Sequence, residues 1–473
     1  MDLAGRRAVV AGAGIAGLAA ALSLGERGAE VVLVDADPPP AVDTADDAFA
    51  RWNRRGAPQF RHSHAFLARL RSILLEAYPE VHRALLDEGA RELRLLDFPP
   101  PALRPLAPEP GDEQLATIGC RRSTFEWVLR RRVTAAPWLV VHGGRTVSAL
   151  VAGPAREVRG VRIDDGRGRS RSIAADLVID ATGRTSRAPR WLAAIGAPPP
   201  LETRSPSSIV YYTRFYRLRR GAEFPVPGDD PTMADFGWIK FAVFPADHRT
   251  FSITFAIPIA LPRLKVLAQA GPFTEMARAF PGLARWVRED FADPLPVGRE
   301  VLAMGGLENC LRRFTDGEGN PLAPGFFAIG DSAYHTNPLY GRGATQAFLH
   351  ARLLGEALDA AAGDVERAAG HLDAAAREEI EPFYRASVAA DRSAARRAEA
   401  KPQGGLLDRL RDSFFAEGVV AASRVDALVF RAFVRMFNMM ETPERAFSTP
   451  EILGRVNAVW LRGRRFRERF APV

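Results

Sequence analysis

Apolar and polar positions near the N-terminus follow a pattern that predicts a strand, a turn, a helix and a second strand. Residues 8–11 are an apolar run, and residues 12–17 read Gly-Ala-Gly-Ile-Ala-Gly. An Ala/Leu-rich stretch continues to Gly28, and the apolar run 31–34 is followed by Asp35. Two short apolar runs joined by a glycine turn and a helix are typical of a unit that binds a dinucleotide.

Each part of this unit has a physical role in the prediction. Gly12 allows a tight turn, Gly14 lets a pyrophosphate approach the backbone, and Gly17 lets the helix lie close to the strand. The free N–H groups and the positive dipole end of the helix favour phosphate. Asp35 stands where a carboxylate can bind the hydroxyl pair of a ribose. The unit alone does not say which dinucleotide is bound.

The pattern further along the chain predicts a mixed α/β arrangement. Ser123 and Glu126 have the spacing of a capping box at the start of a helix. Residues 177–180 are a buried strand that runs into a polar turn. Four other strand-like runs suit a small antiparallel layer that crosses over the main sheet. These runs are residues 139–142, 148–151, 158–163 and 172–173.

Aromatic and β-branched residues dominate the stretch from 205 to 260. Three runs within it are separated by turns and predict an antiparallel sheet in a different domain. They are residues 209–218, 238–245 and 250–258. The aromatic side chains of this sheet either line an apolar pocket or form an ordinary sheet core.

The last third of the chain returns to the α/β pattern and then becomes helical. Residues 326–329 are a second buried strand that ends on Gly330-Asp331, and an Ala/Leu-rich helix is expected from 344 to about 361. The tail from 366 to 473 is mostly helical and rich in arginine. Its end, residues 460–467, is basic and aromatic. It could touch an anionic membrane surface or, as we favour, pack on the body of the protein.

The length of 473 residues and the hydrophobic content of 47% predict a globular chain of two or three domains. No apolar run of 18 residues is present, and the chain starts directly in the first strand, so we expect a cytoplasmic protein without a signal peptide. Cys120 and Cys310 lie far apart, which disfavours a disulfide framework or a thiolate metal site.

The net charge of +8 raises the question of nucleic acid. The excess consists almost entirely of arginines spread along the chain, since lysine occurs only at Lys240, Lys265 and Lys401. We therefore expect no nucleic-acid partner. His62 and His64 could be metal ligands on a strand, but no third ligand is evident nearby, and no metal is predicted. These histidines either seat a loop or lie beside a cofactor ring.

Four motifs occur in order along the chain and together resemble one family. They are Gly12-x-Gly14-x-x-Gly17 with Asp35, Arg122-x-x-Phe125-Glu126, Asp180-x-x-Gly183-Arg184-x-Ser186, and Gly330-Asp331 followed by Asn337-Pro338-x-x-Gly341-x-Gly343. This series resembles the FAD-dependent monooxygenases of the para-hydroxybenzoate hydroxylase fold over residues 1 to about 360. The run Gly56-Ala57-Pro58-Gln59 with the two histidines resembles the bacterial branch of epoxidases and natural-product hydroxylases.

The resemblance implies α/β architecture: a Rossmann-like FAD-binding domain, an antiparallel β-sheet substrate domain and a C-terminal helical region. The expected boundaries are 1–195 and 301–365 for the two parts of the FAD-binding domain, 196–300 for the substrate domain and 366–473 for the helical region.

The resemblance also implies the residues that hold FAD. Asp35 would bind the adenosine ribose, Arg122 the pyrophosphate or ribityl region, and Asp331 the ribityl chain. Pro338 would border the flavin ring, and the helix after Gly343 would face flavin N1 and the C2 carbonyl. The full expected set is Gly12, Gly14, Ile15, Ala16, Gly17, Asp35, Ala36, Arg122, Asp180, Gly183, Gly330, Asp331, Pro338, Gly341, Arg342, Gly343 and Ala344.

The implied reaction is the transfer of one oxygen atom from O2, through a flavin C4a-hydroperoxide, to an apolar aromatic or alkene substrate by hydroxylation or epoxidation. The candidate catalytic and pocket residues are His64, Tyr212, Trp238, His335 and Tyr340. Only one glycine fingerprint is present, so NADPH or NADH would bind transiently, or a partner reductase would supply reduced flavin.

Three alternatives remain open. A flavin-dependent halogenase would carry a catalytic lysine before residue 100 and a Trp-x-Trp-x-Ile-Pro stretch, neither of which this sequence has. A flavin reductase acting on a polyprenyl or other alkene chain would share the fold. A basic module that binds membrane or nucleic acid would contain no flavin.

Overall fold

This computed structural model describes residues 3–38, 40–225, 230–398 and 405–462. A five-stranded parallel sheet forms the centre of the predicted dinucleotide-binding unit. Its strands lie in the order β18-β9-β1-β2-β5. Their bounds are β1 Arg7–Ala11, β2 Glu30–Asp35, β5 Leu139–Gly143, β9 Leu177–Asp180 and β18 Phe326–Ala328. The predicted strand–helix–strand unit is confirmed, since β1 pairs in parallel with β2 and α1 (Ile15–Gly25) lies between them in the sequence.

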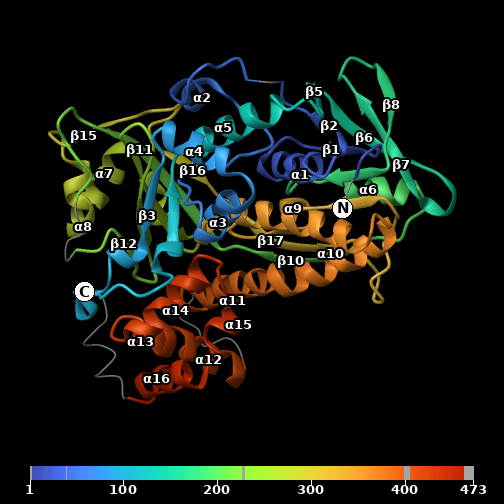
Figure 1. Cartoon of the computed structure of the whole chain (residues 1–473). Helices are drawn as coiled ribbons and strands as arrows, with labels where there is room; N and C mark the ends of the chain where they lie inside the picture. The colour runs from blue at the N-terminus through green and yellow to red at the C-terminus, as the bar shows by residue number, and fades with distance from the viewer. Residues whose placement is uncertain (1–2, 39, 226–229, 399–404, 463–473) are drawn as a thin grey trace.

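Helices and a small sheet pack on this parallel sheet. The helix α1 contacts α5 (Arg122–Thr134) and α9 (Gly343–Ala360), as Figure 1 shows. The strands β6 (Thr146–Ala152), β7 (Val158–Asp164) and β8 (Ser170–Ala174) form an antiparallel layer that contacts β2 and β9. These strands confirm three of the four predicted runs.

The fourth predicted run was assigned to the wrong sheet. Residues 139–142 belong to β5, which pairs in parallel with β2 at the edge of the main sheet. The helix α5 supplies the crossover that a parallel pair requires. The edge position explains the error, because Val140 is 54% exposed and the strand therefore lacks the continuous burial of a central parallel strand.

The predicted antiparallel sheet is confirmed, with six strands. The order is β12-β13-β14-β11-β15, with β16 also paired to β11. The helices α7 (Ala270–Ala279) and α8 (Pro281–Ala284) follow β14 in the chain and contribute Phe273, Ala277 and Leu283 to its apolar core. The strands are β11 Ile209–Leu218, β12 Met233–Asp235, β13 Lys240–Pro245, β14 Thr250–Pro258, β15 Ala292–Pro294 and β16 Leu302–Met304.

Two smaller sheets and several helices complete the part of the chain before residue 365. The sheets are β3 Arg91–Arg94 with β4 Ala116–Gly119, and β10 Leu201–Pro206 with β17 Glu308–Arg313 and β19 Tyr334–His335. The helices are α2 Ala45–Arg51, α3 Ala68–Ala77, α4 Pro79–Asp87 and α6 Ala188–Ala194. The sequence pattern did not predict α2, which begins after Thr44, whose hydroxyl accepts from the Asp47 N–H.

The C-terminal region is helical, as predicted, over its described residues. Its helices are α10 Val365–Glu379, α11 Glu381–Ala398, α12 Leu406–Ser413, α13 Val420–Ala422, α14 Ala427–Phe437, α15 Pro443–Ala446 and α16 Pro450–Leu461, with a π-helical turn at Phe414–Val419. In Figure 1, α11 runs from the dinucleotide-binding unit toward the helices α12 to α16 in the lower part of the view, and it contacts β14, β17 and β19. The Arg431 side chain of α14 is 2% exposed and pairs with Asp112 at 3.0 Å, which ties these helices to the body.

Two further expectations concern the basic stretch near the C-terminus and the absence of a membrane span. Most of the basic stretch 460–467 lies outside the described residues, so its expected packing on the body, with contact to a membrane surface as the alternative, stays a prediction. Among the residues with described positions, no helix has both the length and the apolar character that a membrane span requires.

A buried ion pair ties the antiparallel sheet to the start of α5. Asp247, in the turn between β13 and β14, accepts from the Arg121 N–H at 2.7 Å, from Arg121 Nε at 3.0 Å and from Thr124 Oγ1 at 2.7 Å. These bonds set the N-terminus of α5 at Arg122, with Arg121 as its N-cap. The predicted capping box is therefore wrong: Ser123 lies inside the helix, and its hydroxyl has no partner within the described part of the chain.

Replacement of Asp247 by Ala is expected to destabilise the protein by about 3–5 kcal/mol, because it leaves the Arg121 guanidinium buried without its main partner. Urea denaturation followed by circular dichroism measures this change. The exposed pair Arg288–Asp290 provides the control, since Asp290→Ala is expected to leave the midpoint unchanged. Equal effects of the two substitutions would contradict the assignment.

Candidate functional site

The glycine turn between β1 and α1 is a place where backbones approach too closely for a side chain. Gly12 has a φ of +97°, and a Cβ on it would lie 2.5 Å from the Ala181 carbonyl oxygen. A Cβ on Gly17 would lie 1.8 Å from the Gly12 carbonyl oxygen. Gly12 and Gly17 are thus required by the fold itself, which matches the roles predicted for them.

Gly14 differs from these two glycines because it faces open space. A Cβ on Gly14 would meet only Arg54 Nη2, at 3.9 Å. Gly14 is the N-cap of α1, and no side chain of the residues with described positions caps the N–H groups of the first turn. Ile15 is buried and Ala16 is half-buried, so the backbone of this turn is the part available to an anion.

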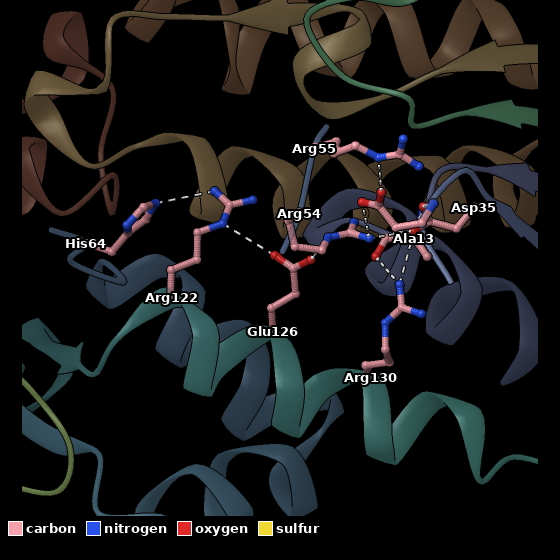
Figure 2. A network of polar contacts seen from close by, with 9 residues as sticks. Ala13, Asp35, Arg54, Arg55, His64, Arg122, Glu126 and Arg130 are labelled. Carbon is pink, nitrogen blue, oxygen red and sulfur yellow. Dashed lines mark hydrogen bonds and ion pairs between the residues drawn. The ribbon is translucent and has the colours of Figure 1, made fainter. Parts of the chain in front are cut away.

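Asp35, at the end of β2, lies in a buried network of charges that Figure 2 shows. Its Oδ2 atom accepts from the Ala13 N–H at 2.9 Å, from Arg54 Nη1 at 2.9 Å and from Arg130 Nη2 at 3.1 Å. Among the residues that the structure describes, its Oδ1 atom accepts only from the Asp37 N–H, at 2.8 Å, and so keeps acceptor capacity for a hydroxyl. Ala36, which follows Asp35, is exposed.

The same network continues along α5 to His64. Arg54 Nε lies 2.9 Å from Glu126 Oε1, and Glu126 Oε2 accepts from Arg122 Nε at 3.4 Å. Arg122 Nη1 in turn lies 3.3 Å from His64 Nε2, as Figure 2 shows. A row of alternating charges thus joins the predicted ribose acid to the loop that carries the two histidines.

His64 is neutral in this arrangement. Its Nδ1 atom is 2.9 Å from the His62 carbonyl oxygen, which can only accept, so Nδ1 carries the proton and Nε2 accepts from Arg122. Burial, with the Arg122 charge, lowers the pKa of His64 to about 3. Burial also lowers the pKa of His62 to about 4, and its Nδ1 atom lies 3.0 Å from Thr213 Oγ1 of β11.

The turn after β9 is closed on itself rather than open to a ligand. The Asp180 carboxylate accepts from the Thr182 N–H at 2.9 Å, from Ser332 Oγ at 3.2 Å and from the Ser186 hydroxyl. The Gly183 N–H donates to Ser332 Oγ at 2.9 Å. Asp180 therefore joins its turn to the Gly330-Asp331 turn, and both oxygens of its carboxylate already accept hydrogen bonds from residues of these two turns.

Asp331 is the carboxylate of this region that remains available. Among the described residues, no hydrogen-bond partner of its side chain is found, while burial raises its pKa and the charges of Arg122 and Arg184 oppose that rise. Gly330 has a φ of +57°, and a Cβ on it would lie 2.7 Å from the Ala16 side chain of α1. The fold thus brings the Gly-Asp turn against the glycine-turn helix.

The loop from Asn337 to Gly343 leads into α9. Pro338 starts a short 3-10 turn and is half-buried, and Gly341 has a φ of +65° with Ala65 close by. Gly343 is exposed with open space around it, and no side chain caps the α9 N-terminus, whereas Ala344 is buried. The Arg342 side chain points away from this opening, because it donates to the Phe383 carbonyl oxygen of α11 at 3.2 Å.

The five candidate pocket residues fall into two groups. His64, His335 and Tyr340 lie near the motifs just described; His335 Nδ1 is 3.3 Å from the Asp331 carbonyl oxygen, and burial lowers the pKa of His335 to about 4. Tyr212 belongs to the core that β11 shares with α7, on the face opposite Tyr211 and Thr213. Trp238 precedes β13 and is 44% exposed. The structure does not bring Tyr212 or Trp238 to the loop.

Sequence reasoning missed two buried residues of the site and misread another. Arg54 and Arg130 have less than a tenth of their side chains exposed, and both guanidinium groups lie 5.6 Å from the Trp52 ring centre. Glu126 was interpreted as half of a capping box. A buried arginine has no signature in a single sequence, although the spacing of Arg122, Glu126 and Arg130 at every fourth residue could have placed all three on one face of α5.

The geometry agrees with comparisons to known proteins. Residues 7–139 match the family model described as FAD dependent oxidoreductase. The match supports a FAD-dependent oxidoreductase, and it covers the N-terminal part of the chain. The chain is 28% identical to protein Rv3254 of Mycobacterium tuberculosis over an alignment of 519 positions, which covers 98% of this chain and 96% of that protein.

The solved structures show that this chain has a fold similar to that of FAD-dependent monooxygenases and halogenases. The structure of PqsL, a probable FAD-dependent monooxygenase from Pseudomonas aeruginosa, matches with a TM-score of 0.57 and 17% identity, over 83% of this chain and 97% of PqsL. The flavin-dependent halogenase CmlS matches with a TM-score of 0.61 and 16% identity, over 97% of this chain and 78% of CmlS. PqsL has also been solved with 2-aminobenzoylacetate.

The residues of this site fit FAD. The open backbone at Gly14 and the uncapped α1 N-terminus suit a pyrophosphate, and Asp35 Oδ1 can accept from a ribose hydroxyl. The unpartnered Asp331 carboxylate suits the hydroxyls of the ribityl chain. The open, uncapped N-terminus of α9 suits the electron-rich edge of the flavin ring.

The substitution Gly14→Ala is expected to separate folding from cofactor binding. Its Cβ has room in the protein, so the thermal midpoint of the FAD-free protein should stay within about 2 °C of the parent. The same methyl group would occupy the pyrophosphate approach, so the Kd for FAD should rise at least about tenfold, roughly 1.4 kcal/mol. Titration of the FAD-free protein with FAD measures this, and an unchanged Kd would exclude Gly14 from the site. Gly17→Ala, the comparison, should impair folding itself.

Acidification is expected to destabilise the FAD-binding unit through its buried histidines. His350 of α9 accepts from the Gly330 N–H at 3.2 Å, and burial lowers its pKa to about 3. A folded-state pKa below the unfolded value near 6.5 means that the unfolded chain binds the proton first. The stability is therefore complete above pH 6.5 and is lost toward pH 3, by up to about 1.4 kcal/mol per pH unit for each such group.

Urea titrations between pH 7.5 and 4.5 test this dependence, with His350→Asn as the matched variant. The amide oxygen of Asn can accept the same N–H bond but does not titrate in this range. The variant should therefore lose less stability than the parent between pH 6.5 and 4.5. Parallel curves for the two proteins would show that His350 is not responsible.

Proposed function

We propose that this chain is a flavin-dependent monooxygenase that inserts one oxygen atom from O2 into an apolar aromatic or alkene substrate. The observation that carries the proposal is a small apolar cluster between the loop of residues 337–343, called the flavin loop below, and the antiparallel sheet. Leu339 of the loop packs there against residues of β11, β14 and β16 and of the segment before β17. The cluster consists of Ile209, Tyr211, Ala256, Met304, Leu307 and Leu339. A substrate placed against this cluster would lie beside the flavin loop.

In the proposed enzyme, FAD supplies two-electron chemistry and the activation of O2 when it is bound. The glycine turn and α1 would hold its pyrophosphate, Asp35 its ribose, and Asp331 its ribityl chain. The α9 N-terminus would stabilise negative charge on the flavin ring. His64, His335 and Tyr340 are proposed to line the cavity near the ring.

The histidines of the proposed site favour chemistry on a neutral substrate. His62, His64 and His335 have pKa values of about 4 or lower, so all three are neutral at physiological pH. The apolar cluster and these neutral rings would exclude water from the substrate position, which an oxygen-transfer enzyme requires to protect its reactive state. Substrate orientation would then come from shape and from the Tyr211 and Tyr340 rings.

A halogenase is a second candidate because the fold is shared with CmlS. The resemblance to that class requires a lysine between the glycine fingerprint and residue 100, and the first lysine of this chain is Lys240. Lys240 is paired with Asp235 at 2.7 Å. A reductase acting on a polyprenyl or other alkene chain would share the FAD site and differ only in the fate of oxygen.

The electron donor is proposed to be NADPH or NADH that binds transiently, or reduced flavin from a partner reductase. The single glycine fingerprint supports this proposal, because a second one would be expected for a resident nicotinamide domain. Cytoplasmic localisation is likewise proposed, in keeping with the abundance of reduced nicotinamide there.

The decisive measurement uses the purified chain loaded with FAD, a reducing system and a panel of aromatic and polyene compounds under ¹⁸O2. The expected product contains one labelled oxygen atom, and labelled water should contribute none. NADH and NADPH are compared with an added flavin reductase, so that the lack of a donor is not mistaken for the lack of an activity.

Two results would contradict the monooxygenase. Consumption of reductant with a reduced but unlabelled product would indicate the alkene reductase. Incorporation of chloride or bromide from the buffer into the product would indicate the halogenase. Both outcomes would leave the FAD site itself intact.

A further inference from the structure

Asn337, the residue before Pro338, is a buried hub of hydrogen bonds at the start of the flavin loop. It is 1% exposed, and its Oδ1 atom accepts from the Leu339 N–H at 3.2 Å and from the Tyr211 hydroxyl. Its Nδ2 atom donates to Ser207 Oγ at 2.9 Å and to Asp391 Oδ1 at 2.8 Å. All the hydrogen-bonding capacity of this amide is therefore used inside the protein.

Asp391 closes a ring of hydrogen bonds through Asn309. The Asn337 N–H donates to Asn309 Oδ1 at 2.8 Å, and Asn309 Nδ2 donates to Asp391 Oδ2 at 2.8 Å. Asp391 is 4% exposed and lies on α11; burial raises its pKa, and hydrogen bonds from Asn309, Asn337 and Ser207 oppose that rise. A carboxylate that only accepts thus fixes the orientation of both amides.

A second contact from α11 holds the other end of the loop. Arg342 Nη1 donates to the Phe383 carbonyl oxygen at 3.2 Å and to Ser387 Oγ at 3.0 Å. The Arg342 guanidinium also lies 5.2 Å from the centre of the Phe383 ring. Both ends of the segment 337–342 are therefore bonded to one helix of the C-terminal region.

We propose that Asp391 is a positioning residue for the flavin ring, and that α11 is a structural part of the cofactor site. Through Asn337, Asp391 sets the start of the loop whose end carries the α9 N-terminus. The same hub orients the Tyr211 ring, which belongs to the apolar cluster proposed to hold substrate. This inference rests on the FAD site described above but not on the fate of oxygen.

The same helix provides a matched control. Glu381 of α11 is also a buried carboxylate, at 6% exposed, and it pairs with Arg313 at 2.8 Å and with Arg385 at 2.7 Å. These arginines lie on β17 and on α11 itself. Loss of the Glu381 charge should therefore weaken the packing of α11 without acting directly on the flavin loop.

The test compares Asp391→Asn with Glu381→Gln in the full chain loaded with FAD. In Asp391→Asn, backbone amide exchange in 337–343 should accelerate at least tenfold, because the three donors Asn309, Asn337 and Ser207 would then meet a group with one remaining acceptor oxygen. The Kd for FAD should rise by about tenfold to a hundredfold, the range expected for a lost hydrogen bond to a charged group. The reduction potential should become more negative, because the α9 N-terminus would stabilise the reduced ring less.

Glu381→Gln should change none of these three readouts, even if it lowers the thermal midpoint. The exchanged pair Asn337→Asp with Asp391→Asn restores one carboxylate facing one amide and should recover most of the loss. Tyr211→Phe removes a single hydroxyl from the hub, is suited to retain the fold, and should give a smaller change of the same sign.

Equal changes in Asp391→Asn and Glu381→Gln would overturn the proposal, because α11 would then only stabilise the fold. Unchanged exchange and FAD affinity in both Asp391→Asn and Tyr211→Phe would overturn it as well. None of these readouts uses a product, so failure of the oxygen-labelling experiment would leave this inference standing.

Discussion

Three backbone segments that are far apart in the sequence meet so closely that only glycine fits between them. Gly12 faces the Ala181 carbonyl, Gly17 faces Gly12, and Gly330 faces the Ala16 side chain of α1. These contacts bring the turns after β1, β9 and β18 to one end of the parallel sheet. Because interiors are close-packed and resist expansion, a single methyl group at such a contact displaces a whole turn. The cofactor site is the space that remains beside these three turns.

Charge is arranged around this space so that burial is tolerated. Arg54 and Arg130 lie opposite Asp35, and Arg54 also faces Asp37 and Glu126. An isolated buried charge would be very costly, but alternating partners at about 3 Å offset that cost. Among the described residues, the buried Nε and Nη1 atoms of Arg130 nevertheless lack a hydrogen-bond acceptor. The network is thus rigid and rich in donors before any anion arrives, which favours binding because little ordering is left to be done.

The sequence allowed the parallel core and the antiparallel sheet to be predicted because their residues follow local periodicity. The glycine turn, the Gly-Asp turn and the strands around residues 210 and 255 are signals of this local kind. The assignment of β5 failed because an edge strand has the burial pattern of an antiparallel strand, and only its partner β2 reveals its direction. Arg54 and Asp391 could not be found, since burial of a charged residue depends on elements distant in the sequence. Tyr211 and Tyr212 show the same limit. Adjacent residues of a strand face opposite sides, and only the packing of the sheet decides which of the two faces the flavin loop.

The order of strands in the parallel sheet has a consequence for synthesis of the chain. The strand β9 pairs on one side with β1 and on the other with β18, which follows about 150 residues later in the sequence. At ribosomal rates of about 5–20 residues per second, the outer edge of β9 stays without its partner for roughly 7–30 s. During that interval all strands of the antiparallel sheet are synthesised, while the hydrogen-bonding edge of the hydrophobic strand β9 remains unpaired. Such an edge is a site for mispairing with other nascent chains, so chaperone demand should be greatest between these two points of elongation.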